Sequence, residues 1–445
     1  MTSVRLRLLL FFLLAGVLGT ACQRERIVPE GAETPDKPSV IPAVTDSLPC
    51  VYIQLPKEIK SKDEWVPYAE IRIDVRVNGQ DQTVYQEDSL NIKGRGNSTW
   101  LYYPKKSYAL KLNHKANFIG TGKTRRWVLL ANWMDRTLLR NQVALEAARR
   151  TSLEWTPSGV FVKLYMNDPA DKTDPNTVRY RGVYWLGEQV RVEGSHFDAD
   201  YLYCYDQADK GNEDFSAYCH YFSGGKWQEG EVPVTVKYPD RDDYPDFYWI
   251  SYLRDASVDA LKEIEEAIYY APNGHWLNKI NLESFVDWYL VNELCHNNEV
   301  RHPKSCYYYI RNGVMYAGPA WDFDFGTFIT TDATSSSLYL KSSLYYFHLF
   351  PLPAFRNCLR ARWAYLKPRF QSLTTYIDEQ AEWIRNSEKD NHEMWPCYPN
   401  PIAVQEHMMM INFDENLSFQ DAVDKLKEAL LLRIRVMDEQ FTQMP

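Results

Sequence analysis

Two aspartates stand two residues apart inside an aromatic and apolar run, Trp321-Asp322-Phe323-Asp324-Phe325-Gly326. Ionised carboxylates in apolar surroundings are costly unless they are paired or bind a cation. Two oxygen ligands at one strand end suit Mg²⁺. If the strand continues through Asp324, the alternation of side chains puts both carboxylates on one face. The alternative is a strand end whose carboxylates cap a turn or a helix.

A lysine and a glutamate fall in phase with apolar positions of two predicted strands. Lys106 does so in a strand over residues 105–112, and Glu188 does so in a strand over residues 184–192. A charged group on a core face usually has a partner or a function, so the two are natural partners. The alternatives are a Lys106 side chain that reaches solvent from the strand end, and two unrelated groups at sheet margins.

The segment Gly94-Arg95-Gly96-Asn97-Ser98 predicts a flexible loop between strands that is rich in hydrogen-bond donors. Its glycines allow backbone amides to approach phosphate oxygens closely. The guanidinium of Arg95 can add a bidentate contact to a phosphate. The alternative is a tight bend with no ligand.

These features belong to a longer series of motifs whose order, spacing and content resemble the CotH kinase family, named after a spore coat protein. The resemblance covers roughly residues 50 to 330. It also includes Asp324-Phe325-Gly326, the metal-binding triplet of protein kinases. The motifs occupy residues 93–100, 104–112, 130–141, 180–188, 291–299 and 321–326.

The resemblance implies an atypical protein kinase that uses ATP and Mg²⁺ and transfers phosphate to a protein hydroxyl. It implies that Lys106 binds phosphate and that Glu188 orients this lysine or reaches the nucleotide. Asp322 and Asp324 would hold Mg²⁺. Phosphoryl transfer suits such a set, because it needs cations on the phosphates, a carboxylate-bound metal and an oriented hydroxyl.

Two further nucleotide-binding candidates are Arg95, from the glycine-rich loop, and Asn141. Asn141 ends the family-like string Asp135-Arg136-Thr137-Leu138-Leu139-Arg140-Asn141. The alternative for that string is a helix cap followed by a core helix.

The catalytic position departs from the family pattern. The family typically has an Asp shortly after an Asn in this segment, and here the string is Asn297-Asn298-Glu299. Glu is one methylene longer than Asp, and a misplacement of roughly 1 Å can cost on the order of 100-fold in rate. Glu299 is therefore a working base or a sign of a weakened enzyme. His296 and His302 are alternative bases.

The predicted fold class is α+β, an atypical protein-kinase-like fold with a mostly antiparallel β-region packed on a helical C-terminal part. Within a domain over 50–445, we expect the nucleotide in the cleft between these two parts. The expected parts are a β-rich part over 50–195, an insertion over 196–254, a catalytic helix and hairpin over 255–339, and a helical part over 340–445.

Local signals predict particular turns and helices within these parts. Asn78-Gly79 predicts a hairpin turn, and a second hairpin is predicted between 305–310 and 314–323. Asp135 is a candidate cap for a helix over about 136–150. Further helices are predicted over 255–270, 282–294 and 419–441.

The N-terminus has the pattern of a bacterial lipoprotein signal. Arg5 and Arg7 precede the apolar run 8–18, and small residues precede Cys22. The sequence thus predicts a signal peptide over 1–21, lipidation of Cys22 and a Pro-rich tether over 22–49. We expect a lipoprotein anchored to a membrane of the bacterial cell envelope, at the outer membrane.

Composition narrows the possible partners. A net charge of −9 argues against nonspecific nucleic-acid binding, which needs a basic face. The 31 Tyr and 14 Trp residues predict a large aromatic core with exposed rings, or else a surface for carbohydrate or peptide. Seven cysteines follow Cys22, and Cys204 with Cys219 is a plausible disulfide pair.

Three functions remain open from sequence. The first is a lipid-tethered kinase dependent on ATP and Mg²⁺, whose physical difficulty is the scarcity of ATP outside the cytoplasm. The second is a catalytically weakened relative that binds a glycan or protein partner. The third is a metal-dependent hydrolase that uses Asp322 and Asp324.

Overall fold

The computed structural model describes residues 39–192, 197–207, 210–211, 213–270, 272–331, 336–397, 412–414 and 416–444 of the 445-residue chain. The predicted signal peptide, Cys22 and most of the predicted tether lie outside the described residues. Within the described ranges, the helices are too short or too polar to cross a membrane.

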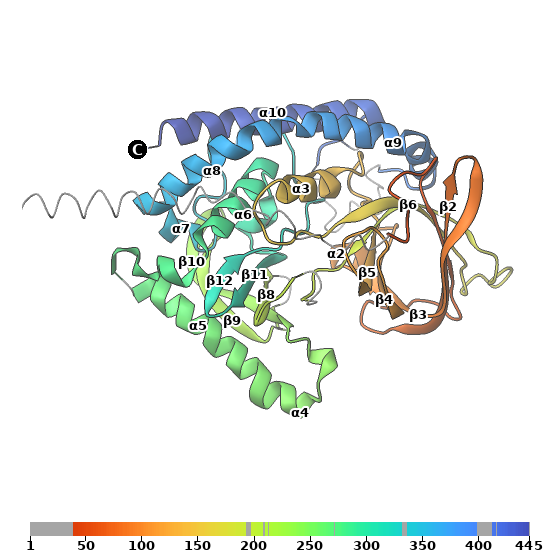
Figure 1. Cartoon of the computed structure of the whole chain (residues 1–445), viewed down its shortest axis with the longest axis horizontal. Coiled ribbons are helices and arrows are strands. Elements are labelled where there is room, and N and C mark those ends of the chain that lie inside the picture. The colour runs from red at the N-terminus through yellow and green to blue at the C-terminus, as the bar shows by residue number, and fades with distance from the viewer. Residues whose placement is uncertain are drawn as a thin grey trace, which may run out of the picture.

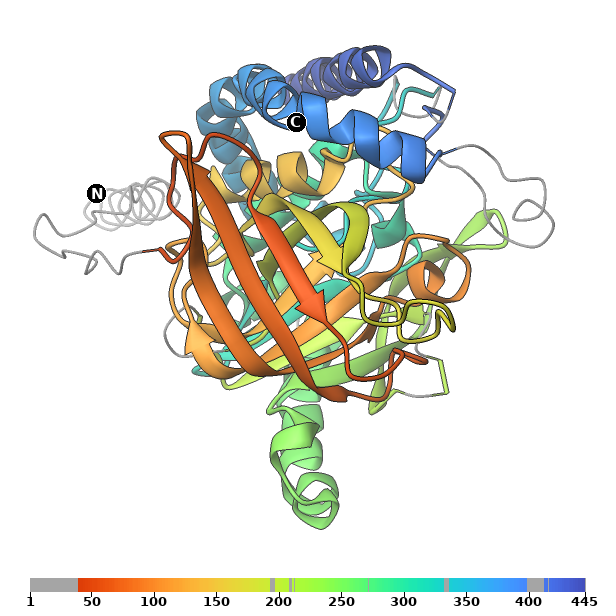
Figure 2. The same cartoon turned by 90° about the vertical axis from the view of Figure 1, so that its right-hand side faces the viewer.

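A closed β-barrel occupies the first part of the described chain and faces the viewer in Figure 2. Its strand order is β1-β2-β3-β4-β5-β7-β6, with antiparallel neighbours except for the parallel pair β1–β6 that closes it. The strands are β1 Cys50–Gln54, β2 Val66–Val77, β3 Gln80–Arg95, β4 Ser107–Ala116, β5 Thr124–Leu130, β6 Gly159–Met166 and β7 Arg179–Glu188.

Side chains along β3 alternate between the barrel core and the opposite face of the strand. Leu90 and Ile92 are buried in the barrel core, whereas Lys93 and Arg95 lie on the opposite face. The predicted turn at Asn78-Gly79 joins β2 to β3, and both residues have positive φ values, 52° and 76°. These are the backbone conformations that a two-residue hairpin turn requires.

An antiparallel sheet forms the second β-layer, with the strand order β12-β11-β8-β10-β9. The segment that the sequence predicts as an insertion provides β8, β9 and β10 of this sheet. The strands are β8 Tyr201–Tyr205, β9 Phe215–Ser223, β10 Lys226–Tyr238, β11 Cys306–Arg311 and β12 Val314–Ala317.

The strand β12 ends earlier than the sequence predicts. It stops at Ala317, so it does not continue through Asp324, and the predicted shared strand face for Asp322 and Asp324 is wrong. Glu299 precedes the hairpin in a short 3₁₀ helix, Asn298–Arg301. Loops therefore carry all three carboxyl groups, although a regular hairpin anchors those loops.

Helices pack on the two β-layers, and α8, α9 and α10 run along one side of the molecule (Figure 1). The predicted α+β class, with a mostly antiparallel β-region and a helical C-terminal part, is confirmed. The main helices are α3 Arg140–Arg149, α5 Asp255–Tyr270, α6 Leu282–Cys295, α8 Pro353–Gln371, α9 Leu373–Met394 and α10 Phe419–Thr442, and a short α7 covers Tyr346–Leu349.

The helices predicted over 255–270, 282–294 and 419–441 are confirmed within a residue or so. The helix predicted from residue 136 begins later, at Arg140. The N-cap residue is Leu139 and not the predicted Asp135, although the Asp135 carboxylate accepts the backbone N–H groups of Thr137 and Arg140 at 2.9 and 2.7 Å.

The strands that carry Cys204 and Cys219 are not neighbours. β10 lies between β8 and β9, and the two thiols are not joined by a disulfide. Their predicted pairing is therefore wrong, because adjacency in sequence does not make β8 and β9 adjacent in the sheet.

A buried carboxyl on α5 fixes this helix to the second sheet. Glu265 accepts a hydrogen bond from the Tyr345 hydroxyl at 2.6 Å, and the Tyr345 and Tyr205 hydroxyls are 2.8 Å apart. Burial raises the pKa of Glu265 to about 7, although the Tyr345 hydrogen bond opposes this shift. The folded state therefore favours the protonated carboxyl of Glu265 more than the unfolded state does.

We expect Glu265 to make stability depend on pH. Its pKa is higher folded than unfolded, so the folded state loses stability as pH rises from about 4.5 to about 7. Over this pH range, the unfolding free energy measured with urea should fall by about 2–3 kcal/mol less in Glu265→Gln than in the wild type. The exposed neighbour variant Glu266→Gln is the control. Parallel pH profiles for wild type and Glu265→Gln would contradict the assignment.

Candidate active site

A cavity of about 600 Å³ lies between the barrel and the second sheet. Its size is in the range of small-molecule sites. Its far wall comes from β8, β10, β11 and the loops at 299–305 and 321–325, and not from the C-terminal helices. The charged residues that line it are the cations Lys62, Lys93, Arg95, Arg126, Arg191, Lys237 and Lys304, and the carboxyl groups Asp206, Asp240, Glu299, Asp322 and Asp324.

The barrel wall of the cavity is cationic. Lys93 and Arg95 project from alternate positions of β3, and Arg126 projects from β5. The Lys93 ammonium and the Arg126 guanidinium lie 4.8 and 5.1 Å from the centre of the Trp65 ring. A wall of this kind attracts an anionic ligand such as a polyphosphate.

Arg95 reaches across the cavity toward the loop that carries the aspartates. Its guanidinium lies 5.2 Å from the centre of the Trp321 ring. Burial lowers the pKa of this guanidinium, while Tyr307 and Asp322 oppose the shift. The predicted site residue Arg95 is therefore in the cavity with Asp322. The position can serve a ligand phosphate that lies between the barrel and the loop.

The predicted glycine-rich loop is only partly a loop, because Gly94 and Arg95 end β3; with the short helix α2, Ser98–Leu101, the segment lines the cavity. A Cβ atom at Gly94 would lie 2.4 Å from the Trp100 ring, so only glycine allows this ring to pack there. The Lys106 ammonium donates to the Trp100 carbonyl at 2.5 Å. Lys106 thus stabilises the backbone of α2 at Trp100.

The acidic wall brings Glu299, Asp322 and Asp324 together, although they lie on two separate loops. Burial raises the pKa of Asp324 to about 7, and the neighbouring Asp322 and Asp135 charges add to the shift. Burial, Asp322 and Asp324 likewise raise the pKa of Glu299 well above its usual value, while Lys304 at 3.9 Å opposes the shift. A cation at this wall would relieve the repulsion.

The backbone of the aspartate loop is fixed at several points. Asp322 has a left-handed conformation, with φ of 68°, which is uncommon outside glycine. The next residue, Phe323, donates its N–H to the Asn141 side chain at 2.7 Å. Asn412 accepts the Gly326 N–H at 2.8 Å and donates to the Asp324 carbonyl at 2.9 Å. These hydrogen bonds fix the backbone around both aspartates.

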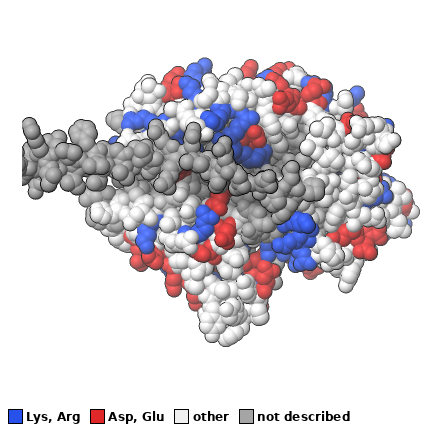
Figure 3. Space-filling model, in the orientation of Figure 1, with Lys and Arg blue, Asp and Glu red and all other residues white. Residues whose placement is uncertain are grey.

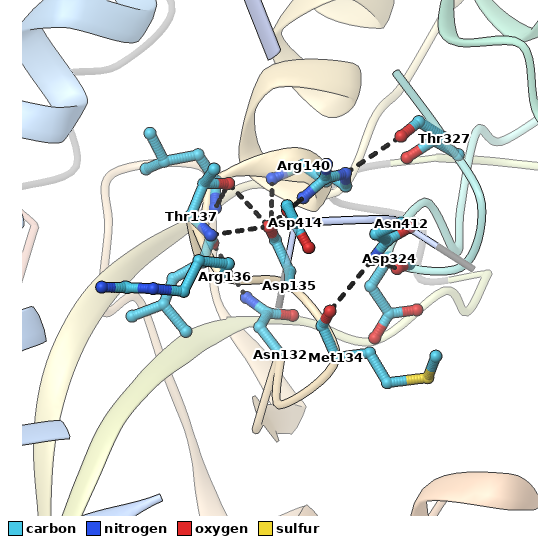
Figure 4. Close-up of polar contacts among 12 residues, drawn as sticks. Asn132, Met134, Asp135, Arg136, Thr137, Arg140, Asp324, Thr327, Asn412 and Asp414 are labelled. Atoms are coloured by element: carbon cyan, nitrogen blue, oxygen red, sulfur yellow. Dashed lines mark hydrogen bonds and ion pairs between the residues drawn. The ribbon is translucent and has the colours of Figure 1, made fainter. Parts of the chain in front are cut away.

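A buried arginine anchors the loop further along (Figure 4). Arg140 is fully buried and pairs with Asp135 and, at 2.6 Å, with Asp414. It also donates to the Thr327 carbonyl at 2.9 Å. One guanidinium therefore joins the start of α3, the aspartate loop and the segment before α10.

Two residues predicted for nucleotide binding, Lys106 and Glu188, are absent from the cavity lining among the described residues. The Glu188 carboxylate binds the Thr121 hydroxyl at 2.6 Å and the Ser158 N–H at 3.0 Å. Lys106 is half-buried and donates to the Trp100 carbonyl, so its environment differs from that of Glu188. Their roles toward nucleotide stay predictions.

The buried lysine is Lys105 and not Lys106, because the alternation at the start of β4 buries residues 105, 107 and 109, the face opposite to the predicted one. The Lys105 ammonium donates to the Ala131 carbonyl at 2.8 Å and to the Asn391 side chain at 2.9 Å. Burial lowers its pKa to about 7. Lys105 therefore ties the barrel to α9.

His296 and His302 lie outside the described lining of the cavity. His296 stacks on Tyr339 with ring centroids 3.7 Å apart, and burial with the Arg433 and Arg301 charges lowers its pKa to about 3. Burial also lowers the pKa of His302. Glu299 is consequently a better-placed candidate base than either histidine.

Several site residues have weak sequence signals. Lys93 directly precedes the predicted glycine-rich loop, but only the structure shows that it shares a face of β3 with Arg95. Arg126, Asp206, Lys237 and Asn412 could not be found from the sequence, since each comes from a segment whose position relative to the cavity depends on tertiary packing.

The donor set suits Mg²⁺ that shares its coordination with phosphates and water. Among the described residues, no group of three His, Cys, Asp or Glu side chains is arranged to hold a metal alone. Asp322 and Asp324 are hard oxygen ligands, and burial together with the neighbouring Asp322 and Asp135 raises the pKa of Asp324. These two residues would hold the ion.

The fold and site agree with a comparison of the sequence with protein families. The family described as CotH kinase protein matches residues 92–437, which is most of the chain. The chain therefore belongs to the CotH kinase family. Membership suggests an atypical protein kinase and implies the use of ATP. A search of curated proteins returned no match.

Proposed function

We propose that this protein is a Mg²⁺-dependent protein kinase of the CotH family that acts at the bacterial cell envelope and phosphorylates a protein hydroxyl. The observation that carries the proposal is the cavity itself. A cationic barrel wall faces a cluster of carboxyl groups, Glu299, Asp322 and Asp324, across a space of about 600 Å³. Phosphoryl transfer needs this combination of charges.

The residues of the two walls have separate roles in the proposed reaction. Arg95, with Lys93 and Arg126 beside it, binds the phosphates of ATP. Asp322 and Asp324 hold Mg²⁺, which supplies charge neutralisation when it is bound. Asn141 orients the loop between them through the Phe323 N–H. These contacts position the nucleotide and leave the acceptor side open.

Glu299 is the proposed general base. Burial and the neighbouring Asp322 and Asp324 raise its pKa well above the usual value, which favours the protonated carboxyl. Neutralisation of those charges would lower that pKa and let Glu299 accept the proton of the acceptor hydroxyl. The loop Asn297–Arg301 positions it, because the Asn297 side chain accepts the Glu299 N–H at 3.1 Å.

The proposed location rests on the sequence of the first residues, with Cys22 as the lipidated residue and the outer membrane as the site of anchoring. Incorporation of a labelled fatty acid into the wild type should be lost in Cys22→Ser. Equal labelling of both proteins would exclude this anchor.

We expect Asp322→Asn to abolish the stabilisation that ATP gives in the presence of Mg²⁺. Asn tolerates the left-handed conformation at this position, so the fold should remain intact. A thermal shift with and without Mg²⁺ measures this effect, since a bound ligand stabilises the folded state by mass action. Asp81→Asn, at an exposed aspartate of β3, is the matched control.

An unchanged Mg²⁺·ATP shift in Asp322→Asn would remove Asp322 from the proposed metal site. If the wild-type protein shows no ATP shift and no transfer, the weakened binding protein becomes the better hypothesis. Hydrolysis of a phosphate ester without ATP binding would instead support the hydrolase.

We expect Glu299→Ala to lower phosphoryl transfer by about 100-fold or more while the Mg²⁺·ATP thermal shift stays, because a general base acts on the hydroxyl and contributes 10²–10⁴-fold. Glu299→Asp should lower transfer less, since its carboxylate withdraws by roughly 1 Å. Full activity in Glu299→Ala would place the base elsewhere. Higher activity in Glu299→Asp would mean that the longer side chain is a defect.

A further inference from the structure

A helical arm projects from the body of the protein next to the second sheet (Figures 1 and 2). It consists of α4 Asp246–Tyr248, the π-helix η3 Trp249–Arg254 and α5. The outer end of this arm carries exposed aromatic and aliphatic side chains. We define the arm tip as Tyr244, Phe247, Tyr248, Ile250 and Tyr252.

The apolar side chains of the arm tip are strongly exposed to solvent. Phe247 is 72% exposed and Tyr252 is 56% exposed. The Tyr248 and Tyr252 rings lie 5.3 Å apart, and Phe247 meets Tyr252 edge-on at 6.2 Å. Contiguous exposed apolar groups of this kind mark interaction sites in soluble proteins.

The arm itself is firmly fixed to the protein. Trp249 is 1% exposed and belongs to the main core, as do Leu261, Ile264 and Ile268 of α5. The Tyr203 hydroxyl donates to the Ser257 carbonyl at 2.6 Å. The π-helix turns Trp249 inward while its neighbours face outward, and such helices occur often at functional sites. The aromatic tip is therefore presented on a rigid support.

The excess of acidic residues near the arm tip favours a cationic partner over an anionic one. The sequence over 240–264 has seven Asp or Glu and three Lys or Arg. In Figure 3 the lower lobe of the molecule, which holds α4, is mostly white, with red atoms beside it and blue atoms on the surface above it. An acidic surface repels anionic lipid, whereas lysine and arginine side chains of a polypeptide are attracted to it and to the faces of tyrosine rings.

The arm also begins at the rim of the cavity. Asp240 lines the cavity and pairs with Arg191, another lining residue, which is 2.7 Å from Asp243. The chain that leads into the arm therefore starts at the cavity lining.

We propose that the arm tip is a docking site for a cationic polypeptide segment of the phosphoacceptor protein. This identification of the partner rests on the proposed kinase function, but the binding itself does not require ATP. Aromatic side chains supply the buried contact, as in other protein interfaces, and the surrounding carboxylates supply attraction and orientation.

The test is the binding of a fluorescent random copolymer of lysine and tyrosine to the full-length protein, without ATP or Mg²⁺. Phe247→Ser should weaken binding roughly 10-fold. Tyr68→Ser, which changes a 76% exposed tyrosine on the barrel, should leave it unchanged. Asp246→Asn with Asp255→Asn should weaken binding and reduce its salt dependence, whereas Asp81→Asn should not.

Equal copolymer binding by wild type and Phe247→Ser would overturn the proposal. Binding of phosphatidylcholine–phosphatidylglycerol vesicles or of cellohexaose that depends on Phe247, without such binding of the copolymer, would also overturn it. These readouts remain valid if the protein fails to bind ATP, so a failure of the kinase proposal is distinguishable from a failure of the docking proposal.

Discussion

The repulsion among buried carboxyl groups is the constraint around which the site is arranged. Asp322, Asp324 and Glu299 come together from two loops, and burial with their mutual repulsion raises the pKa of Asp324 and of Glu299. Such an arrangement persists only if the surrounding structure fixes the loops firmly. The buried cation Arg140, held by Asp135 and Asp414, provides that anchor from outside the cavity.

The two β-layers support charges of opposite sign around the cavity. The barrel is closed, so its strands expose few edges and its outer face is free to carry cations such as Lys93 and Arg95. The second sheet supports the hairpin β11–β12, whose flanking loops carry the carboxyl groups. The charges of opposite sign thus lie on separately folded supports, and a ligand that bridges them would join the two layers.

The C-terminal part contributes to this arrangement although it does not line the cavity. Asn412 binds the backbone on both sides of Phe325, and Asp414 pairs with Arg140. Lys105 links the barrel to α9 through Asn391. The helices therefore act as positioning elements for a site that is built from the preceding segments.

The sequence alone determined the α+β class, the helices α5, α6 and α10, the Asn78-Gly79 turn and the aspartate pair, because these depend on local periodicity, capping and turn chemistry. It did not determine barrel closure, the place of β8–β10 or the burial of Lys105 in place of Lys106. Those features depend on pairing between distant segments, which no local pattern records. Tertiary packing likewise decided that Glu299 meets Asp322, since loops carry both residues and only the folded chain brings the loops together.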